Sequence, residues 1–366
     1  QLVFNLTPFY PEGGGQVGDK GVIESQIETI AIVDTKKENN LIVHLIDELP
    51  KDVNANFMAK VDASNRKASE RNHTATHLLQ ESLIMVLGEH VVQKGSLVNP
   101  NYLRFDFTHF SKIEKSDLHK IELDVNAKIL ANISLNEYVD LPLSKAEGMG
   151  AIMLFGEKYE DVVRMIQFDS SKELCGGTHV KATGEIGLFK IISEGSTSSG
   201  IRRIEAITGV SALAYLNKKE DLLNEISSVV KNKDVKKGVE QLITANKILE
   251  KQILTFKKSN AANVKADLLK DVVEVNNIRF ISKQVLMEAE DMKNVSFALR
   301  EEKNLVMVLA AKVNEKVLLT VMLTDDVVAK GYNAAAMIKD IAKEIDGGGG
   351  GQAFFATAGG VRTGGI

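Results

Sequence analysis

The spacing of hydrophobic residues changes several times along the chain, and each change predicts a different kind of element. In residues 1–62, short apolar stretches are separated by Gly, Asn and Lys, which is typical of strands joined by turns. From Ser64 to about Gly88, Leu and Ile recur every three or four residues, which predicts a helix with Gly88 as its C-cap. Further predicted elements are strands at 102–107 and 162–168 and a helix at 112–133.

These elements mix without a regular βαβ order, so we predict an α+β fold. The first strands are short and are expected to form a small β-barrel-like subdomain. The predicted division is 1–62 for this subdomain, 63–209 for an α+β domain, 210–265 for a helical spacer and 266–366 for a small α/β domain.

The spacer carries a heptad pattern. Apolar residues are spaced four and three apart over about three repeats, with one polar member, at Val235, Val239, Leu242, Asn246, Leu249, Ile253 and Phe256. Such a seam is a pairing face, and a polar seam residue can fix register and partner number. Two interpretations stay open: a hairpin with a helix at 212–230, or a coiled coil between two chains.

The C-terminal region alternates predicted strands with predicted helices. The strands are at 279–282, 305–310 and 317–323, and the helices at 295–302 and 334–345. A run of five glycines follows, Gly347–Gly351. It is not a phosphate-binding loop, because no Lys-Ser/Thr follows it and no clear helix comes after it.

Composition narrows the class of protein. A chain of 366 residues is long enough for two or three domains, and the single Cys175 fits a reducing, cytoplasmic setting. No apolar run reaches the roughly 20 residues needed to cross a bilayer, so we expect a soluble protein without a membrane partner. The net charge of −4 confines any contact with a polyanion to local patches. Because Gln1 opens a strand-like run, we expect a preceding domain to be missing.

The clearest chemical signal is two pairs of side chains far apart in sequence. His73 and His77 lie four residues apart on a predicted helix, so both imidazoles project from one face. The segment Cys175-Gly-Gly-Thr-His179 places a thiolate and an imidazole around a tight glycine loop. Either pair alone is more often unrelated to metal binding. Together they use three of seven His and the only Cys, which predicts one Zn²⁺ per chain.

Four protein ligands leave the role of this ion open. Closed four-ligand zinc is usually structural, whereas catalytic zinc keeps a position for water or substrate. Either one ligand is displaced when substrate arrives, or the ion positions substrate while other groups direct the water.

The order of motifs resembles the editing region of alanyl-tRNA synthetases. The motifs are TPFYPEGGGQVGDKG (7–21), RNHTATHLL (71–79), VVQKGSLV (91–98), LRFDFTHF (103–110), LFGEKY (154–159), ELCGGTHV (173–180) and SEGSTSSGIRRIEAITG (193–209). Residues 211–366 resemble the same enzymes' C-terminal domain, so the resemblance covers essentially the whole chain. This sequence departs from the family by following its glycine run with Gln-Ala-Phe-Phe rather than a basic and an acidic residue.

The resemblance implies zinc-dependent hydrolysis of Ser-tRNA(Ala) and Gly-tRNA(Ala). Such a second site is needed because a pocket for alanine excludes glycine and serine poorly. It also implies that Thr76 senses the amino-acid side chain and that Gln93 orients the ester or the attacking water. Without the resemblance, Thr76 would be interpreted as bonding back to its own helix and Gln93 as a surface amide.

Further residues are candidate contacts to tRNA, each with a simpler alternative. They are Gly14, Gly15, Gln16, Arg202, Arg203, Gly349 and Phe354. The Gly13–Gln16 turn could approach the CCA end or be a tight hairpin. The two arginines could meet phosphate or pair with Glu205. Phe354 could stack on a base.

The predicted function is therefore that of the editing and C-terminal part of an alanyl-tRNA synthetase. Its expected partners are tRNA(Ala), an absent N-terminal part that attaches alanine with ATP, and a second copy of the chain through the C-terminal region. Two alternatives stay open: a tRNA-binding and dimerisation module with structural zinc, or a free-standing editing protein.

Overall fold

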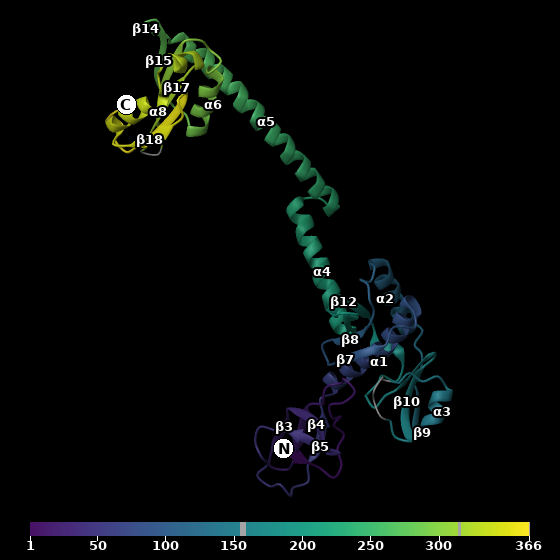
Figure 1. Ribbon diagram of the computed structural model, residues 1–366. Helices are drawn as coiled ribbons and strands as arrows, with labels where there is room; N and C mark the ends of the chain where they lie inside the picture. The colour runs from purple at the N-terminus through teal and green to yellow at the C-terminus, as the bar shows by residue number, and fades with distance from the viewer. Residues whose placement is uncertain (154–158, 314–315, 366) are drawn as a thin grey trace. The chain divides into compact units, whose positions relative to one another are not determined.

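The computed structural model describes residues 1–153, 159–313 and 316–365, and the chain forms two compact units, 1–225 and 226–366 (Figure 1). The mixture of helices and sheets confirms the predicted combination of α and β structure. None of the helices in the described ranges has the length and hydrophobicity required to span a membrane.

Residues 1–62 form two three-stranded antiparallel sheets, with strand orders β1-β5-β4 and β3-β2-β6. The strands are β1 (Leu2–Val3), β2 (Gly21–Glu24), β3 (Thr29–Ile32), β4 (Asp34–Glu38), β5 (Leu41–Leu45) and β6 (Met58–Val61). The prediction of a barrel-like subdomain was wrong in that the described sheets do not close on each other. Closure requires one continuous ring of hydrogen-bonded strands, whereas these strands pair into two separate sheets of three.

Helix α1 (Ala63–Leu87) is the central element of the first unit, and it confirms the helix predicted for this region. It begins at Asp62, whose carboxylate accepts a hydrogen bond from the Asn65 backbone N–H. It ends at Gly88, which has a φ of 109°; glycine adopts this positive value readily because it has no Cβ. The middle of the helix is buried over about two and a half turns from Asn72 to Gln80, so polar and apolar side chains both enter the interior.

Two sheets and two further helices surround α1. A four-stranded antiparallel sheet has the order β12-β13-β8-β7, and a three-stranded sheet has the order β11-β10-β9. Their elements are β7 (Gln93–Val98), β8 (Leu103–Thr108), α2 (Lys115–Leu130), β9 (Asn136–Pro142), α3 (Leu143–Gly148), β10 (Val162–Phe168), β11 (Ser171–Leu174), β12 (Phe189–Ser198) and β13 (Ile201–Thr208). The main core joins α1, α2 and the four-stranded sheet through residues such as Leu79, Phe105 and Ile121.

The spacer consists of α4 (Gly209–Val230) and α5 (Val235–Lys270). Helix α5 continues beyond the predicted end of the spacer at residue 265, because Leu268 and Val264 pack into a core of the C-terminal domain. Its heptad seam faces solvent, since Val239, Leu242 and Phe256 are exposed. Pairing of this seam, within or between chains, stays a prediction.

The C-terminal domain is a six-stranded mixed sheet with the order β14-β15-β16-β17-β19-β18, in which only β15 and β16 run parallel among the described pairs. Its elements are β14 (Val273–Val275), β15 (Ile278–Val285), α6 (Ala289–Leu299), β16 (Leu305–Val313), β17 (Lys316–Leu323), α7 (Asp325–Ala329), α8 (Ala334–Ile341), β18 (Gly348–Gly351) and β19 (Phe355–Gly360). Successive side chains of a strand point to opposite faces of the sheet, so the sheet has a core on each face. Helix α8 packs in one of these cores and helix α6 in the other. The glycine run therefore forms an edge strand.

Candidate metal centre

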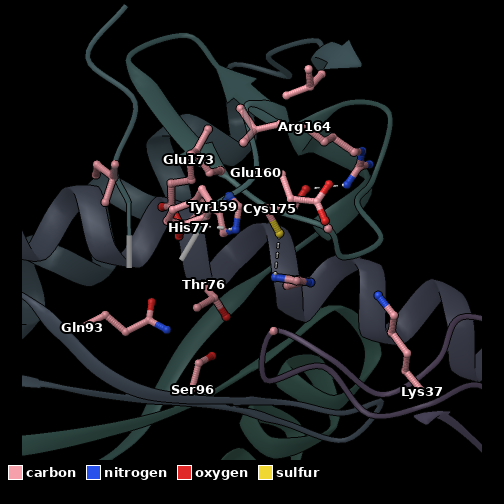
Figure 2. Close-up of a pocket in the computed structure, with 17 residues that line it drawn as sticks. Lys37, Thr76, His77, Gln93, Ser96, Tyr159, Glu160, Arg164, Glu173 and Cys175 are labelled. Carbon is pink, nitrogen blue, oxygen red and sulfur yellow. Dashed lines mark hydrogen bonds and ion pairs between the residues drawn. The ribbon is translucent and has the colours of Figure 1, made fainter. Parts of the chain in front are cut away.

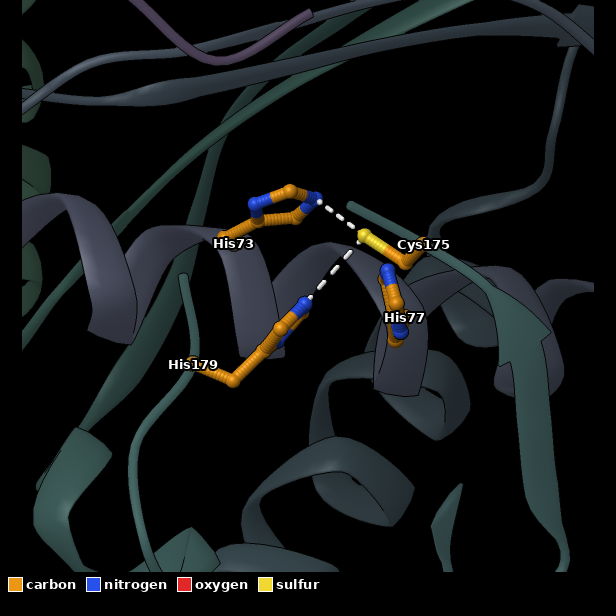
Figure 3. Close-up of side chains that lie close together, drawn as sticks. All are labelled: His73, His77, Cys175 and His179. Carbon is orange, nitrogen blue, oxygen red and sulfur yellow. Dashed lines mark hydrogen bonds between the residues drawn. The ribbon is translucent and has the colours of Figure 1, made fainter. Parts of the chain in front are cut away.

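The four side chains predicted as metal ligands converge in the first unit. Helix α1 supplies His73 and His77, and the loop after β11 supplies Cys175 and His179. One potential ligand atom from each lies within 4.8 Å of all the others. The Cys175 Sγ is 3.4 Å from His73 Nε2 and 3.3 Å from His179 Nε2 (Figure 3).

This arrangement fits a zinc ion. Zinc bonds of about 2.0–2.3 Å in a tetrahedron separate the ligand atoms by about 3.3–3.6 Å, so the cluster needs only a small contraction. Three imidazoles and a thiolate are the borderline-soft donors that zinc accepts. In the described part of the chain, His77 Nδ1 and Glu173 Oε1 are also buried without a hydrogen-bond partner, which leaves the cluster chemically incomplete.

Burial sets the protonation of these groups. It lowers the pKa of His73 to about 4, helped by the positive charge of Arg164, and it lowers the pKa of His77 and His179 well below the usual value. Neutral imidazoles carry the lone pair that a metal needs. Burial also raises the pKa of Glu173 to about 8. Its carboxylate oxygen Oε2 lies 3.4 Å from His77 Nε2.

The Cys-Gly-Gly-Thr-His loop is held against α1 by close packing. An added Cβ at Gly177 would lie 2.0 Å from the Cε1 atom of His73, whereas at Gly176 nothing lies within 4 Å. The Arg164 guanidinium donates to the carbonyl oxygens of Cys175 at 2.8 Å and Gly177 at 2.7 Å. Arg164 had no signal in the sequence, because it comes from β10 and meets the loop only in the folded chain.

Gln16, a predicted contact to tRNA, points its side chain into the protein, and its contact with tRNA stays a prediction. Gln16 is fully buried, and its Oε1 lies 2.7 Å from His73 Nδ1. The residues before it form the simpler alternative, a tight hairpin: Gly13 and Gln16 exchange backbone hydrogen bonds, and Gly14 and Gly15 have positive φ. Contact of Gly14 and Gly15 with tRNA stays a prediction.

A cavity of about 450 Å³ lies beside the cluster (Figure 2). Its lining includes His73, His77 and Cys175 together with Thr76 and Gln93, the two residues predicted to contact the aminoacyl ester. The Thr76 hydroxyl donates to the Asn72 carbonyl at 2.8 Å, so the back-bonded alternative also holds, and the lone pairs of the Thr76 oxygen stay available to accept a hydrogen bond. Glu173, which no motif of the sequence marks as a site residue, also lines this cavity.

Both predicted phosphate-contacting arginines are paired with carboxylates. Arg203 makes a bidentate pair with Asp106, at 2.7 Å for each bond, and Arg202 pairs with Glu194. Pairing with a carboxylate, the simpler alternative, therefore holds with other partners than the expected Glu205, which accepts from the Ser193 hydroxyl and acts on Arg203 through its charge. Strand pairing, which spacing along the chain does not reveal, decides these partners.

The remaining candidates lie in the second unit or outside the described residues. Gly349 lies in β18, and the guanidinium of Arg300 stacks 3.9 Å from the ring centroid of Phe354. Contact of either residue with tRNA stays a prediction. Of the LFGEKY motif, only Tyr159 lies within the described residues, and it lines the cavity.

Comparison with known proteins identifies the relatives of this chain. Residues 163–205 match the family described as threonyl and alanyl tRNA synthetase second additional domain, and residues 1–65 match tRNA synthetases class II (A). The alanine–tRNA ligase of Bacteroides fragilis is 50% identical over 100% of this chain and 42% of its own length. That of Cytophaga hutchinsonii is 48% identical over the same shares. The C-Ala domain of Aquifex aeolicus alanyl-tRNA synthetase is 24% identical and covers 25% of this chain and 84% of its own, with a TM-score of 0.24 that supports no conclusion about the fold.

The two family matches and the His/Cys cluster define the class as an editing-type domain of class II aminoacyl-tRNA synthetases. Within that class, the chain belongs to the alanine–tRNA ligase family, as its motifs predicted. It resembles the C-terminal portion of these enzymes and spans about 42% of the length of the curated relatives that it matches.

Proposed function

We propose that residues 1–209 hydrolyse the ester of tRNA(Ala) that carries serine or glycine, with one zinc ion held by His73, His77, Cys175 and His179. The observation that carries this proposal is the convergence of these four side chains next to a cavity lined by Thr76 and Gln93. The chemistry that zinc supplies when bound in such a site is polarisation of a carbonyl and a lowered pKa of water.

The reaction is the addition of water to the ester carbonyl carbon. The bond from that carbon to the ribose oxygen breaks, a proton passes to that oxygen, and the products are a free amino acid and deacylated tRNA. Gln93, at the cavity wall, is placed to orient the ester or the water by hydrogen bonds from its amide. A covalent route is the weaker mechanism, because Cys175 as a metal ligand is not available as a nucleophile.

Thr76 supplies the discrimination in this proposal. A serine hydroxyl bound beside Thr76 can donate to the Thr76 oxygen, whose own hydrogen is bonded to the Asn72 carbonyl, whereas bound alanine leaves that oxygen without a donor at a cost of about 1–3 kcal/mol. Such a difference favours serine over alanine by a factor of about 5 to 150. The editing site thus favours the serine ester over the alanine ester, which is the opposite of the preference required of the site that attaches alanine.

The test is hydrolysis of Ser-tRNA(Ala) beside Ala-tRNA(Ala) by this chain. We expect the serine ester to be hydrolysed faster, Thr76→Val to reduce the preference, and Cys175→Ala to remove activity. Thr244→Val is a matched control, since the Thr244 hydroxyl donates to the Glu240 carbonyl at 2.8 Å in the same helical geometry far from the cavity in sequence. Equal hydrolysis of both esters by the unmodified chain would refute the discrimination.

A metal with only a structural role is the second candidate, favoured by the four-ligand set. Removal of the metal separates the two. Retained folding with lost hydrolysis supports a role in the reaction, whereas global unfolding supports a structural role.

For the longer protein, we propose attachment of alanine to tRNA(Ala) with ATP by a part outside this chain. We further propose that residues 266–366 bind tRNA and that the heptad seam of α5 pairs with a second copy. Sedimentation of this chain with a Leu249→Lys variant tests the pairing, because a lysine in a seam position prevents close approach of two apolar faces.

A further inference from the structure

We propose that Gln16 is a positioning residue of the metal centre: its side-chain amide fixes the tautomer and the orientation of the His73 ring, so that Nε2 faces the ion. This inference rests on the proposed zinc site, and it assigns to the N-terminal subdomain a part in building that site.

The orientation of the Gln16 amide follows from its neighbours. The backbone N–H of Thr178 donates to Gln16 Oε1 at 3.0 Å, and Gln16 Nε2 donates to the Thr178 hydroxyl at 2.8 Å. A backbone N–H can only donate, so the atom that faces it must be the carbonyl oxygen. The amide is therefore locked in one of its two orientations.

The tautomer of His73 follows from that orientation. Gln16 Oε1 lies 2.7 Å from His73 Nδ1, and an amide oxygen can only accept. Nδ1 must carry the hydrogen, which leaves the lone pair of the neutral ring on Nε2. That nitrogen lies 3.4 Å from Cys175 Sγ, inside the cluster.

A second ligand is held in a parallel way. His179 Nδ1 lies 3.0 Å from the Thr74 hydroxyl, which also accepts from the Val180 backbone N–H. The Nε2 atom of His179 then faces Cys175 Sγ at 3.3 Å. Outer partners that orient the imidazole in this way are a general feature of metal sites. His73 differs because its partner comes from another subdomain, 57 residues earlier in the chain.

The backbone around Gln16 is built to hold this position. The Val98 N–H donates to the Gly15 carbonyl at 2.7 Å, and the Val17 N–H donates to the Val98 carbonyl at 3.0 Å. A Cβ at Gly15 would lie 2.7 Å from the Ser96 carbonyl oxygen, so only glycine allows the turn to approach β7 this closely. The Gly13–Gln16 turn is thus pinned to the strand that carries Gln93.

The test uses the full chain and three variants. Gln16→Met keeps the length of the side chain and removes its hydrogen bonds. Gln16→Glu keeps an acceptor for His73 Nδ1. Asp19→Asn weakens the pair between Asp19 and Arg66, which holds the same segment on α1, but leaves the Gln16 bonds in place.

Two readouts are measured on each protein. Zinc affinity is determined by competition with a chelator, and the absorption of the Co²⁺-loaded protein reports the ligand geometry. The tautomer of His73 is read from long-range ¹H–¹⁵N NMR correlations of the metal-free protein. We expect Gln16→Met to weaken zinc by about 10–100-fold and to mix the tautomers, while Gln16→Glu and Asp19→Asn retain the Nδ1–H form.

Unchanged zinc affinity and an unchanged His73 tautomer in Gln16→Met would overturn the inference. Failure of the unmodified chain to bind zinc would instead overturn the proposed metal centre. In that case the tautomer in metal-free protein still decides the role of Gln16, since that measurement needs no ion.

Discussion

The two glycines of the Cys-Gly-Gly-Thr-His loop are predicted to tolerate alanine very differently. At Gly177, the new Cβ would lie 2.0 Å from His73 Cε1 and 2.4 Å from His73 Nδ1. Carbon atoms in contact are normally about 3.5–4.0 Å apart, so the ring or the loop must move by about 1.5 Å. At Gly176, nothing lies within 4 Å of the Cβ, and neither residue has a positive φ that would strain alanine.

The ring cannot move freely, which sets the size of the effect. His73 Nδ1 is bonded to Gln16 and its Nε2 lies beside Cys175, so a shift breaks one or both contacts. Overpacking of this kind costs about 1–3 kcal/mol of folding free energy. Metal–ligand distances tolerate only about ±0.2 Å, and a misplacement of about 1 Å can cost about 100-fold in rate. We therefore expect Gly177→Ala to lose zinc affinity and at least about 100-fold of Ser-tRNA(Ala) hydrolysis.

The matched variant Gly176→Ala should stay within about 0.5 kcal/mol of the unmodified protein in stability and keep its zinc affinity. Both proteins are compared by urea unfolding, by zinc competition and by hydrolysis of Ser-tRNA(Ala). Equal behaviour of the two variants would refute the reasoning, because it would mean that the loop does not press on His73 in solution.

Three further predictions concern single side chains of the first unit. Burial raises the pKa of Glu173 from 4.5 to about 8, so its neutral form contributes stability that is fully present below about pH 4.5 and is lost as pH rises to about 8. Metal-free Glu173→Gln should therefore gain stability relative to the parent across this window, and parallel pH profiles in urea unfolding would contradict it. Asp62→Ala should cost about 1 kcal/mol in the same assay, because it removes the N-cap of α1, whereas Asp52→Ala in an exposed turn serves as its control. Phe105→Ala should cost about 3–5 kcal/mol, since this ring is fully buried in the main core, and a loss below about 1 kcal/mol would mean that the core is not packed as described.

Helix α1 and its two histidines could be predicted from the sequence because all of the necessary information is local. The apolar period, the glycine after the helix and the four-residue spacing of His73 and His77 are properties of one segment. The same holds for the loop from Cys175 to His179. That the two segments meet was inferred from chemistry, since each pair supplies half of a ligand set.

The outer partners of the site could not be predicted, because they come from strand pairing and from contacts between distant segments. Gln16 and Glu173 are polar residues that look like surface positions in the sequence, yet both are buried beside the histidines. The partners of Arg202 and Arg203 depend on which strands are neighbours. The edge strand β18 had no signal either, since glycine has low strand propensity. It pairs closely with β19, where a Cβ at Gly349 would lie 2.4 Å from the Thr357 carbonyl oxygen.

The placement of the substrate-sensing residue follows from the period of α1. Thr76 and His77 follow His73 by three and four residues, so all three share one face of the helix and line the same cavity. This helical half of the site holds its side chains within about 0.5 Å of their positions, more precisely than the loop that supplies Cys175 and His179 would by itself. The proposed preference for serine over alanine needs that precision, because it depends on a single hydrogen bond. A change that bends α1 between Asn72 and Gln80 should therefore impair discrimination and metal binding together, even where every ligand remains.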